Sequence, residues 1–134
     1  MWRAVVHDWT KFTPSEWSSY VHSFYSLDGT KKIIKKENTT LEVGRMSTAF
    51  HYAWNNHQKA NRHHWQYWVL VNDEDGIQPL EIPETYLREM LADWEGAGQA
   101  ITGKADPKGW YVRNKEKFIL HEKTRALVES LLDV

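Results

Sequence analysis

The sequence of 134 residues contains no cysteine. This absence excludes disulfides, thiolate metal sites and a cysteine nucleophile. Neither sign of charge prevails, because 17 Lys and Arg stand against 18 Asp and Glu, for a formal net charge of −1. Such a balance gives no general attraction to nucleic acids or anionic membranes. No apolar run approaches the roughly 20 residues of a membrane span, and the N-terminus lacks a secretory apolar segment. We therefore expect a cytoplasmic protein with no membrane partner and no strong nucleic-acid partner.

Aromatic residues and histidines are abundant by contrast. Eight Trp, six Tyr and four Phe supply bulky core material, because each aromatic side chain buries a large apolar area. Four of the seven histidines fall between residues 51 and 64. The length fits one domain with one hydrophobic core, so the domain prediction is a single one over residues 1–134.

Apolar residues recur at helical spacing along most of the chain. The predicted helices cover about residues 3–9, 13–28, 46–58, 83–98, 106–111 and 122–132. Residues 30–45 are charged and irregular, which indicates a loop, and the stretch 66–82 leaves room for one small β-hairpin. The pattern predicts a mainly α fold, a compact bundle of five to six helices.

Capping residues support several of these boundaries. Thr13-Pro14 and Asp106-Pro107 each place an N-capping side chain before a first-turn proline. Gly96-Ala97-Gly98 marks the expected end of the helix that Pro83 opens.

His7 and Asp8 form the first candidate site. Adjacent residues on a helix point about 100° apart, so both reach one ion only where two faces meet at a cleft. An imidazole beside a carboxylate suits Mn, Fe, Ni or Zn, and less well Mg. Lys11 follows His7 by one helical turn, where its ammonium can neutralise a phosphate at the metal or simply face solvent.

Asp93 is the second candidate. It falls beside the apolar stripe of the helix predicted from Pro83, close to Tyr86 and Met90. A carboxylate in such a place needs a cation, a metal ion or several hydrogen bonds. A metal ligand and a partner of Arg or Lys are therefore equally good interpretations.

His57, His63 and His64 are the third candidate. His57 shares the inward face of the helix predicted over 46–58, whereas in a continuous helix His63 would point away from it. If Asn61 breaks the helix, His63 and His64 can both point into one shared space. A core histidine bonded to a backbone carbonyl is the usual alternative, but a metal ion would satisfy all three imidazoles together.

The residues His7-Asp8-Trp9-Thr10-Lys11 resemble the His-Asp-x-x-Lys signature of HD-domain metal-dependent phosphohydrolases, which are all-helical. The resemblance implies an HD-like fold in which His7 and Asp8 bind metal and Asp93 is the late aspartate ligand. It makes His57, His63 and His64 candidates for a second metal position. HD domains also carry a ligand histidine on an earlier helix, and we expect this N-terminal helix to be missing or truncated here.

A second resemblance covers the chain from His7 to Glu129. It rests on the segments HDWTKFTPSEW, AFHYAWNNHQKANRHHWQYWVL, IPETYLREMLADWEGAG and WYVRNKEKFILHEKTRALVE. These segments are similar to a family of uncharacterised phage and bacterial proteins, which implies no activity. If the protein is phage-encoded, its expected location is the host cytoplasm.

The leading hypothesis is a metal-dependent phosphohydrolase acting on a nucleotide or another small phosphate ester. Asp8 and Lys11 would act in catalysis, and the ion would be Mn, Fe, Ni, Zn or Mg. The alternative is a non-catalytic phage or host interaction protein with a structural metal or histidine cluster. In either case a Trp-rich helical protein of this size could form a homo-oligomer.

A third hypothesis is a nuclease of the His-Asn-His type, suggested by Asn61-Arg62-His63-His64. Such a site needs a β-hairpin that leads into a helix. The helical pattern over 46–58 occupies the place of the first strand, and the near-neutral charge also disfavours tight DNA binding.

Overall fold

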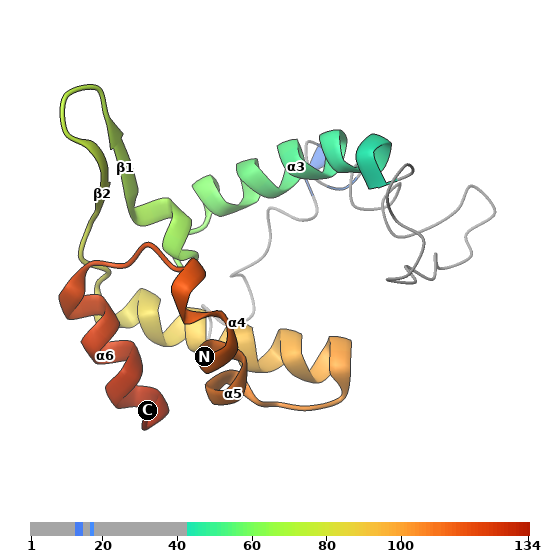
Figure 1. Cartoon of the computed structure of the whole chain (residues 1–134). Helices are drawn as coiled ribbons and strands as arrows, with labels where there is room; N and C mark the ends of the chain where they lie inside the picture. The colour runs from blue at the N-terminus through green and yellow to red at the C-terminus, as the bar shows by residue number, and fades with distance from the viewer. Residues whose placement is uncertain (1–12, 15–16, 18–42) are drawn as a thin grey trace. The chain divides into compact units, whose positions relative to one another are not determined.

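The computed structural model describes residues 13, 14, 17 and 43–134, and over 43–50 it describes the backbone alone. The chain divides into two compact units, residues 1–61 and 62–134. The described part is mainly helical with a small two-stranded antiparallel sheet, as predicted (Figure 1). It contains four α-helices, α3 to α6, so the count of five to six for the whole chain stays a prediction.

Most of the predicted N-terminal structure lies outside the described residues. The helix predicted over 3–9 is entirely outside them. Of the next helix, Pro14 and Trp17 are helical, and the Trp17 N–H donates to the Thr13 carbonyl at 2.8 Å. This bond fits a helix that begins after Thr13, as the Thr-Pro pair indicates.

Helix α3 runs from Val43 to Ala60 and belongs to the first unit. It begins within the segment 30–45, for which we predicted a loop. Ala53 and His57 lie one turn apart and are each 1% exposed, whereas His51 is exposed. The predicted inward face is thus confirmed for the described side chains.

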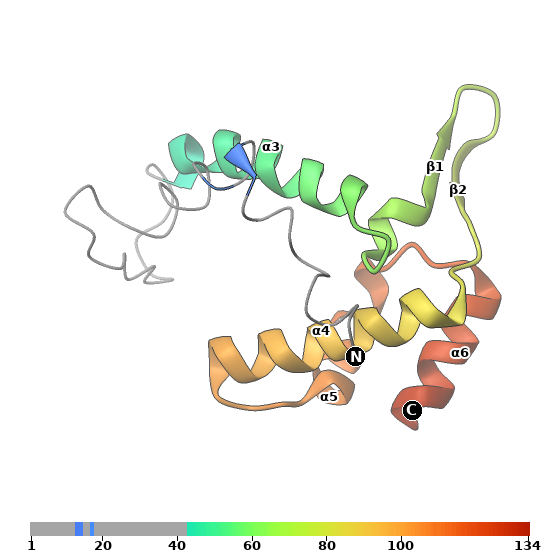
Figure 2. The same cartoon turned by 180° about the vertical axis from the view of Figure 1, so that it is seen from behind.

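The second unit starts with the 3₁₀-helix η2, Trp65–Trp68, and the predicted hairpin. Strand β1, Val69–Asn72, pairs with β2, Gly76–Pro79, so that Val71 faces Ile77. Gly76 has φ of 72°, the left-handed conformation that closes such a short loop at low cost. Both views show the hairpin extending away from the helices of this unit (Figures 1 and 2).

Helix α4 runs from Glu84 to Thr102, beyond the end predicted at 96–98. Gly96 and Gly98 lie inside the helix, because a helical glycine costs only about 1 kcal/mol and does not by itself end a helix. The helix ends at Gly103, whose φ of 74° is left-handed and whose N–H donates to the Gln99 carbonyl at 3.0 Å.

Two further helices complete the second unit. Helix α5, Pro107–Asn114, begins as predicted, because the Asp106 side chain accepts a hydrogen bond from the Gly109 N–H at 2.8 Å. The short 3₁₀-helix η3, Lys115–Lys117, follows it. Helix α6, Glu122–Leu132, has the predicted bounds. Thr124 and Val128 of this helix are buried, whereas Ala126 is exposed.

The hydrophobic core of the second unit is formed by helices α4, α5 and α6 and the segments between them. Its buried members are Ile82, Leu87, Met90, Tyr111, Phe118 and Val128. Thr124 contributes the main polar contact, because its hydroxyl accepts a hydrogen bond from the buried Ile82 N–H at 3.0 Å. No helix of the described residues is long and apolar enough to cross a membrane.

Candidate metal centre

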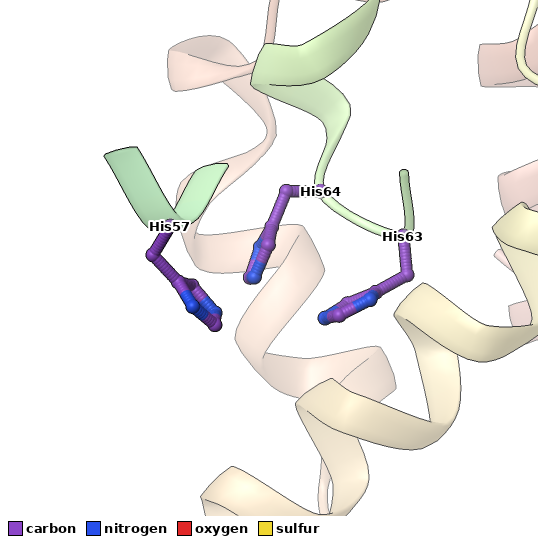
Figure 3. A group of neighbouring side chains, drawn as sticks. All are labelled: His57, His63 and His64. Carbon is purple, nitrogen blue, oxygen red and sulfur yellow. The ribbon is translucent and has the colours of Figure 1, made fainter. Parts of the chain in front are cut away.

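Three histidines converge within the eight-residue segment 57–64. Their side chains point toward one another (Figure 3). One ring nitrogen from each of His57, His63 and His64 lies within 4.8 Å of the corresponding atoms of the other two. All three are buried, with exposed fractions of 1%, 4% and 8%. Among the described residues this is the one such group of His, Asp and Glu side chains.

The end of α3 brings these residues together. The helix stops at Ala60, and residues 62–64 form a turn before η2. The Tyr67 N–H donates to the His64 carbonyl at 3.1 Å, and the Trp68 indole donates to the Arg62 carbonyl at 2.8 Å. These two bonds fix the backbone of the turn. The break at Asn61 that we considered therefore occurs, and His63 does not splay away from His57.

Neighbouring rings orient the imidazoles. Trp54 stacks on His57 with ring centroids 5.6 Å apart and planes 22° apart. The rings of His63 and His64 have centroids 4.3 Å apart and planes tilted by 42°. Asn61, 7% exposed, donates from its side-chain amide to the His57 carbonyl at 2.8 Å and also approaches His57 Nδ1 at 3.2 Å. His57 thus has one ring face and one ring edge covered.

The donor set fits a divalent transition-metal ion. Nitrogen ligands lie about 2.0–2.1 Å from zinc, which places two ligands of a tetrahedral ion about 3.4 Å apart. The three ring nitrogens lie within 4.8 Å of one another, a separation of the same order. Imidazoles suit Zn, Cu, Fe and Ni, whereas Mg prefers oxygen ligands. Three protein ligands leave at least one position of the ion for another group.

An exposed cationic residue directly precedes His63 in the sequence. The exposed Arg62 guanidinium donates to the Tyr86 hydroxyl at 3.1 Å and lies 5.9 Å and 5.8 Å from the ring centroids of Tyr67 and Tyr86. Hydrogen bonds to the Tyr86 and Tyr67 hydroxyls raise the pKa of Arg62 further above its ordinary value. The residue therefore carries its positive charge at neutral pH.

The whole chain, residues 1–134, matches DUF5662, a family of unknown function. The protein belongs to this family. Comparisons with curated proteins and with solved structures gave no match. DUF5662 membership carries neither an HD-type fold nor a phage origin with it, so both stay predictions.

The other predicted ligands of this DUF5662 protein are not part of the described cluster. His7, Asp8 and Lys11 lie outside the described residues. Asp93 is half-buried on α4 and is not in the group of three histidines. The roles of His7, Asp8 and Asp93 as metal ligands, and of Lys11 in catalysis, stay predictions.

Two side chains beside the cluster were not predicted as site residues. Asn61 was considered as a helix breaker and as part of a nuclease motif but not as a partner of His57, although its spacing of four from His57 places it one helical turn away. Arg62 carries no sequence signal of its own, because its contacts with Tyr67 and Tyr86 depend on how η2 and α4 pack.

The second unit of the DUF5662 chain also has a cavity of about 400 Å³ between α4 and α5. Trp94, Ile101 and Trp110 form its apolar wall. Its rim includes Arg113 and Asp106, whose charged groups are 3.6 Å apart and offset each other. None of the predicted ligands that the structure describes, His57, His63, His64 and Asp93, lines this cavity.

Proposed function

We propose that the protein binds a divalent transition-metal ion through His57, His63 and His64 and hydrolyses a small phosphate ester, such as a nucleotide. The observation that carries the metal site is the convergence of three buried imidazoles with ring nitrogens within 4.8 Å of one another. Imidazole is the commonest metal ligand in proteins, and one ion can bind one nitrogen from each of the three rings. Zn, Fe or Ni fits this donor set better than Mg does.

The phosphate chemistry is supported by charge and by motif. A bound ion of this kind supplies Lewis acidity for hydrolysis of a phosphate ester. The Arg62 guanidinium, adjacent in sequence to His63 and exposed, can hold a phosphate by paired hydrogen bonds. The His-Asp-x-x-Lys residues 7–11 resemble the HD signature, so the proposal gives Asp8 and Lys11 catalytic roles and an HD-like fold to the chain. His7 and Asp93 are its further proposed ligands.

The hairpin favours a second candidate, a non-catalytic interaction protein in which the histidine cluster holds a structural metal. Leu70, Val71, Ile77 and Leu80 are exposed on or next to the hairpin. Apolar side chains gathered on a projecting hairpin are typical of surfaces that bind another protein. The low exposure of the three histidines also suits a structural metal.

Metal content tests the shared part of both candidates. Protein purified without a chelator or a His tag should contain close to one equivalent of Zn, Fe, Ni or Mn by elemental analysis. His64→Gln should lose most of it, because one of three ligands is gone. His51→Gln is the matched control: it removes an exposed imidazole from the same part of the chain, and it should keep the metal.

Turnover then separates the two candidates. A panel of nucleotides with added Mn²⁺, Mg²⁺, Co²⁺ or Ni²⁺ should be hydrolysed by the parent and by His51→Gln, but not by His64→Gln or Asp8→Ala. Circular dichroism checks that each variant is folded. Metal in the parent without turnover would favour the interaction protein. Equal metal in His64→Gln and the parent would contradict the site itself.

A further inference from the structure

The amide of Asn61 has both of its N–H groups directed at His57. Asn61 Nδ2 donates to the His57 carbonyl at 2.8 Å and lies 3.2 Å from His57 Nδ1. The first contact fixes the orientation of the amide, because the opposite orientation would place two carbonyl oxygens against each other. The group that faces Nδ1 is therefore a donor, and both residues are buried.

A donor at this position determines where the His57 proton is. Neutral imidazole carries one proton, so one ring nitrogen donates and the other accepts. Because Asn61 donates to Nδ1, Nδ1 must hold the lone pair and Nε2 must carry the proton. The contact with Asn61 thus favours the Nε2–H tautomer of His57 when the metal is absent.

Neither nitrogen of His57 is then available to a metal without a change at Asn61. Binding through Nδ1 takes the lone pair that the Asn61 amide occupies. Binding through Nε2 requires the proton to move to Nδ1, where it would meet the amide donor. Both routes break the 3.2 Å contact. This differs from the common arrangement, in which the second-shell partner accepts a hydrogen bond from the ligand histidine and strengthens metal binding.

We propose that Asn61 is a positioning residue that holds His57 in the Nε2–H tautomer and so weakens and gates metal binding at the three-histidine cluster. This inference rests on the proposed function. Metal binding must break the hydrogen bond between Asn61 and His57, so the free energy of that bond is subtracted from the free energy of binding. Replacing Asn61 should therefore tighten metal binding by about two- to tenfold.

The tautomer is measured first, by ¹⁵N NMR of the imidazole rings in metal-free protein at a pH where imidazole is neutral. The parent should show the Nε2–H form at His57. Asn61→Asp keeps the size of the side chain but replaces the donor by an acceptor, so it should shift His57 toward Nδ1–H. An Nδ1–H tautomer in the parent would overturn the inference, whatever the protein does with metals.

The affinity is measured second, by Zn²⁺ titration against a chromophoric chelator. Asn61→Ala and Asn61→Asp should both bind Zn²⁺ about two- to tenfold more tightly than the parent. Asn55→Ala, which changes an exposed asparagine of helix α3, should match the parent. Unchanged or weaker binding in both Asn61 variants would overturn the gate and make Asn61 a supporting residue.

The two readouts distinguish failure of the gate from failure of the proposed function. If no variant binds Zn²⁺, the metal centre is wrong and the gate fails with it, while the NMR spectrum still shows whether Asn61 sets the tautomer. If the parent binds Zn²⁺ and the Asn61 variants bind it no more tightly, the metal centre stands and the gate alone is wrong.

Discussion

Tyr111 is fully buried, and its side chain carries a titratable hydroxyl group. The hydroxyl donates to Glu129 at 3.1 Å and accepts from the Arg125 guanidinium at 3.2 Å. Burial, and then the hydrogen bond to Glu129, raise the pKa of Tyr111 above its usual value, while Arg125 opposes them. The folded protein therefore holds the phenolic proton more tightly than the unfolded chain does.

This difference predicts a loss of stability at alkaline pH. A raised folded-state pKa contributes stability that is complete below the unfolded pKa of about 10 and is lost as the pH rises through the folded pKa. Tyr111→Phe removes the ionising group, so its free energy of unfolding should fall less steeply above pH 10. At neutral pH the variant should be less stable by about 1–2 kcal/mol, because Glu129 loses a donor. Urea denaturation across pH 7–11 measures both effects.

An exposed tyrosine provides the control for this residue. Tyr52 is 70% exposed, so Tyr52→Phe removes a hydroxyl without emptying a buried position. At neutral pH Tyr52→Phe should be as stable as the parent, because no buried contact is lost. A parent-like slope in Tyr111→Phe would show that another group causes the alkaline loss.

Gly96 and Gly98 both lie inside helix α4, but a side chain would meet different neighbours at the two positions. A Cβ added at Gly98 would lie 2.9 Å from the Lys104 carbonyl oxygen, whereas a Cβ at Gly96 would meet nothing within 4 Å. The Thr102 hydroxyl donates to the Gly98 carbonyl at 2.8 Å and accepts from the Lys104 N–H at 3.3 Å, which holds the following segment against the end of the helix. Gly98 is thus required by a close backbone approach, and Gly96 is not.

Replacement by alanine should therefore have opposite effects on the free energy of unfolding at these two glycines. Gly96→Ala should raise the free energy of unfolding by up to about 1 kcal/mol, because alanine favours the helix. Gly98→Ala should lower it by about 1–3 kcal/mol, because the methyl group forces the 103–106 segment away from α4. Urea denaturation at neutral pH measures both, each variant being the control for the other. Stabilisation by Gly98→Ala would contradict the close approach.

The elements differ in how far local sequence determines them. The start of α5 and the bounds of α6 could be predicted, because capping residues and apolar spacing act within one or two turns. The end of α4 could not, because Gly96, Gly98 and Gly103 give the same sequence signal and only Gly103 adopts the left-handed conformation that ends the helix. The same holds at the histidine cluster. The sequence spacing of His57 and His64 suggested that the two residues share a site. The hydrogen bonds that fix the turn from Arg62 to Trp68, such as the one from the Trp68 indole to the Arg62 carbonyl, follow no recognisable sequence pattern.

At the scale of the whole molecule, a metal ion would act on stability as well as on chemistry. The unfolded chain does not hold His57, His63 and His64 together, so the ion prefers the folded state. A ligand present at a hundredfold excess over its Kd adds about 2.7 kcal/mol to the free energy of unfolding. For a protein of this size that corresponds to a rise in Tm of about 10 °C.

Thermal unfolding with and without Zn²⁺ should therefore separate a specific site from general binding of metal to histidines. The parent and His51→Gln should both gain about 10 °C with Zn²⁺ and lose the gain when EDTA is added. His64→Gln should gain little, although it has as many histidines as His51→Gln. The comparison is sharp because the two variants differ only in which imidazole is missing, one buried in the cluster and one exposed. An equal gain in all three proteins would place the stabilising ion elsewhere on the chain.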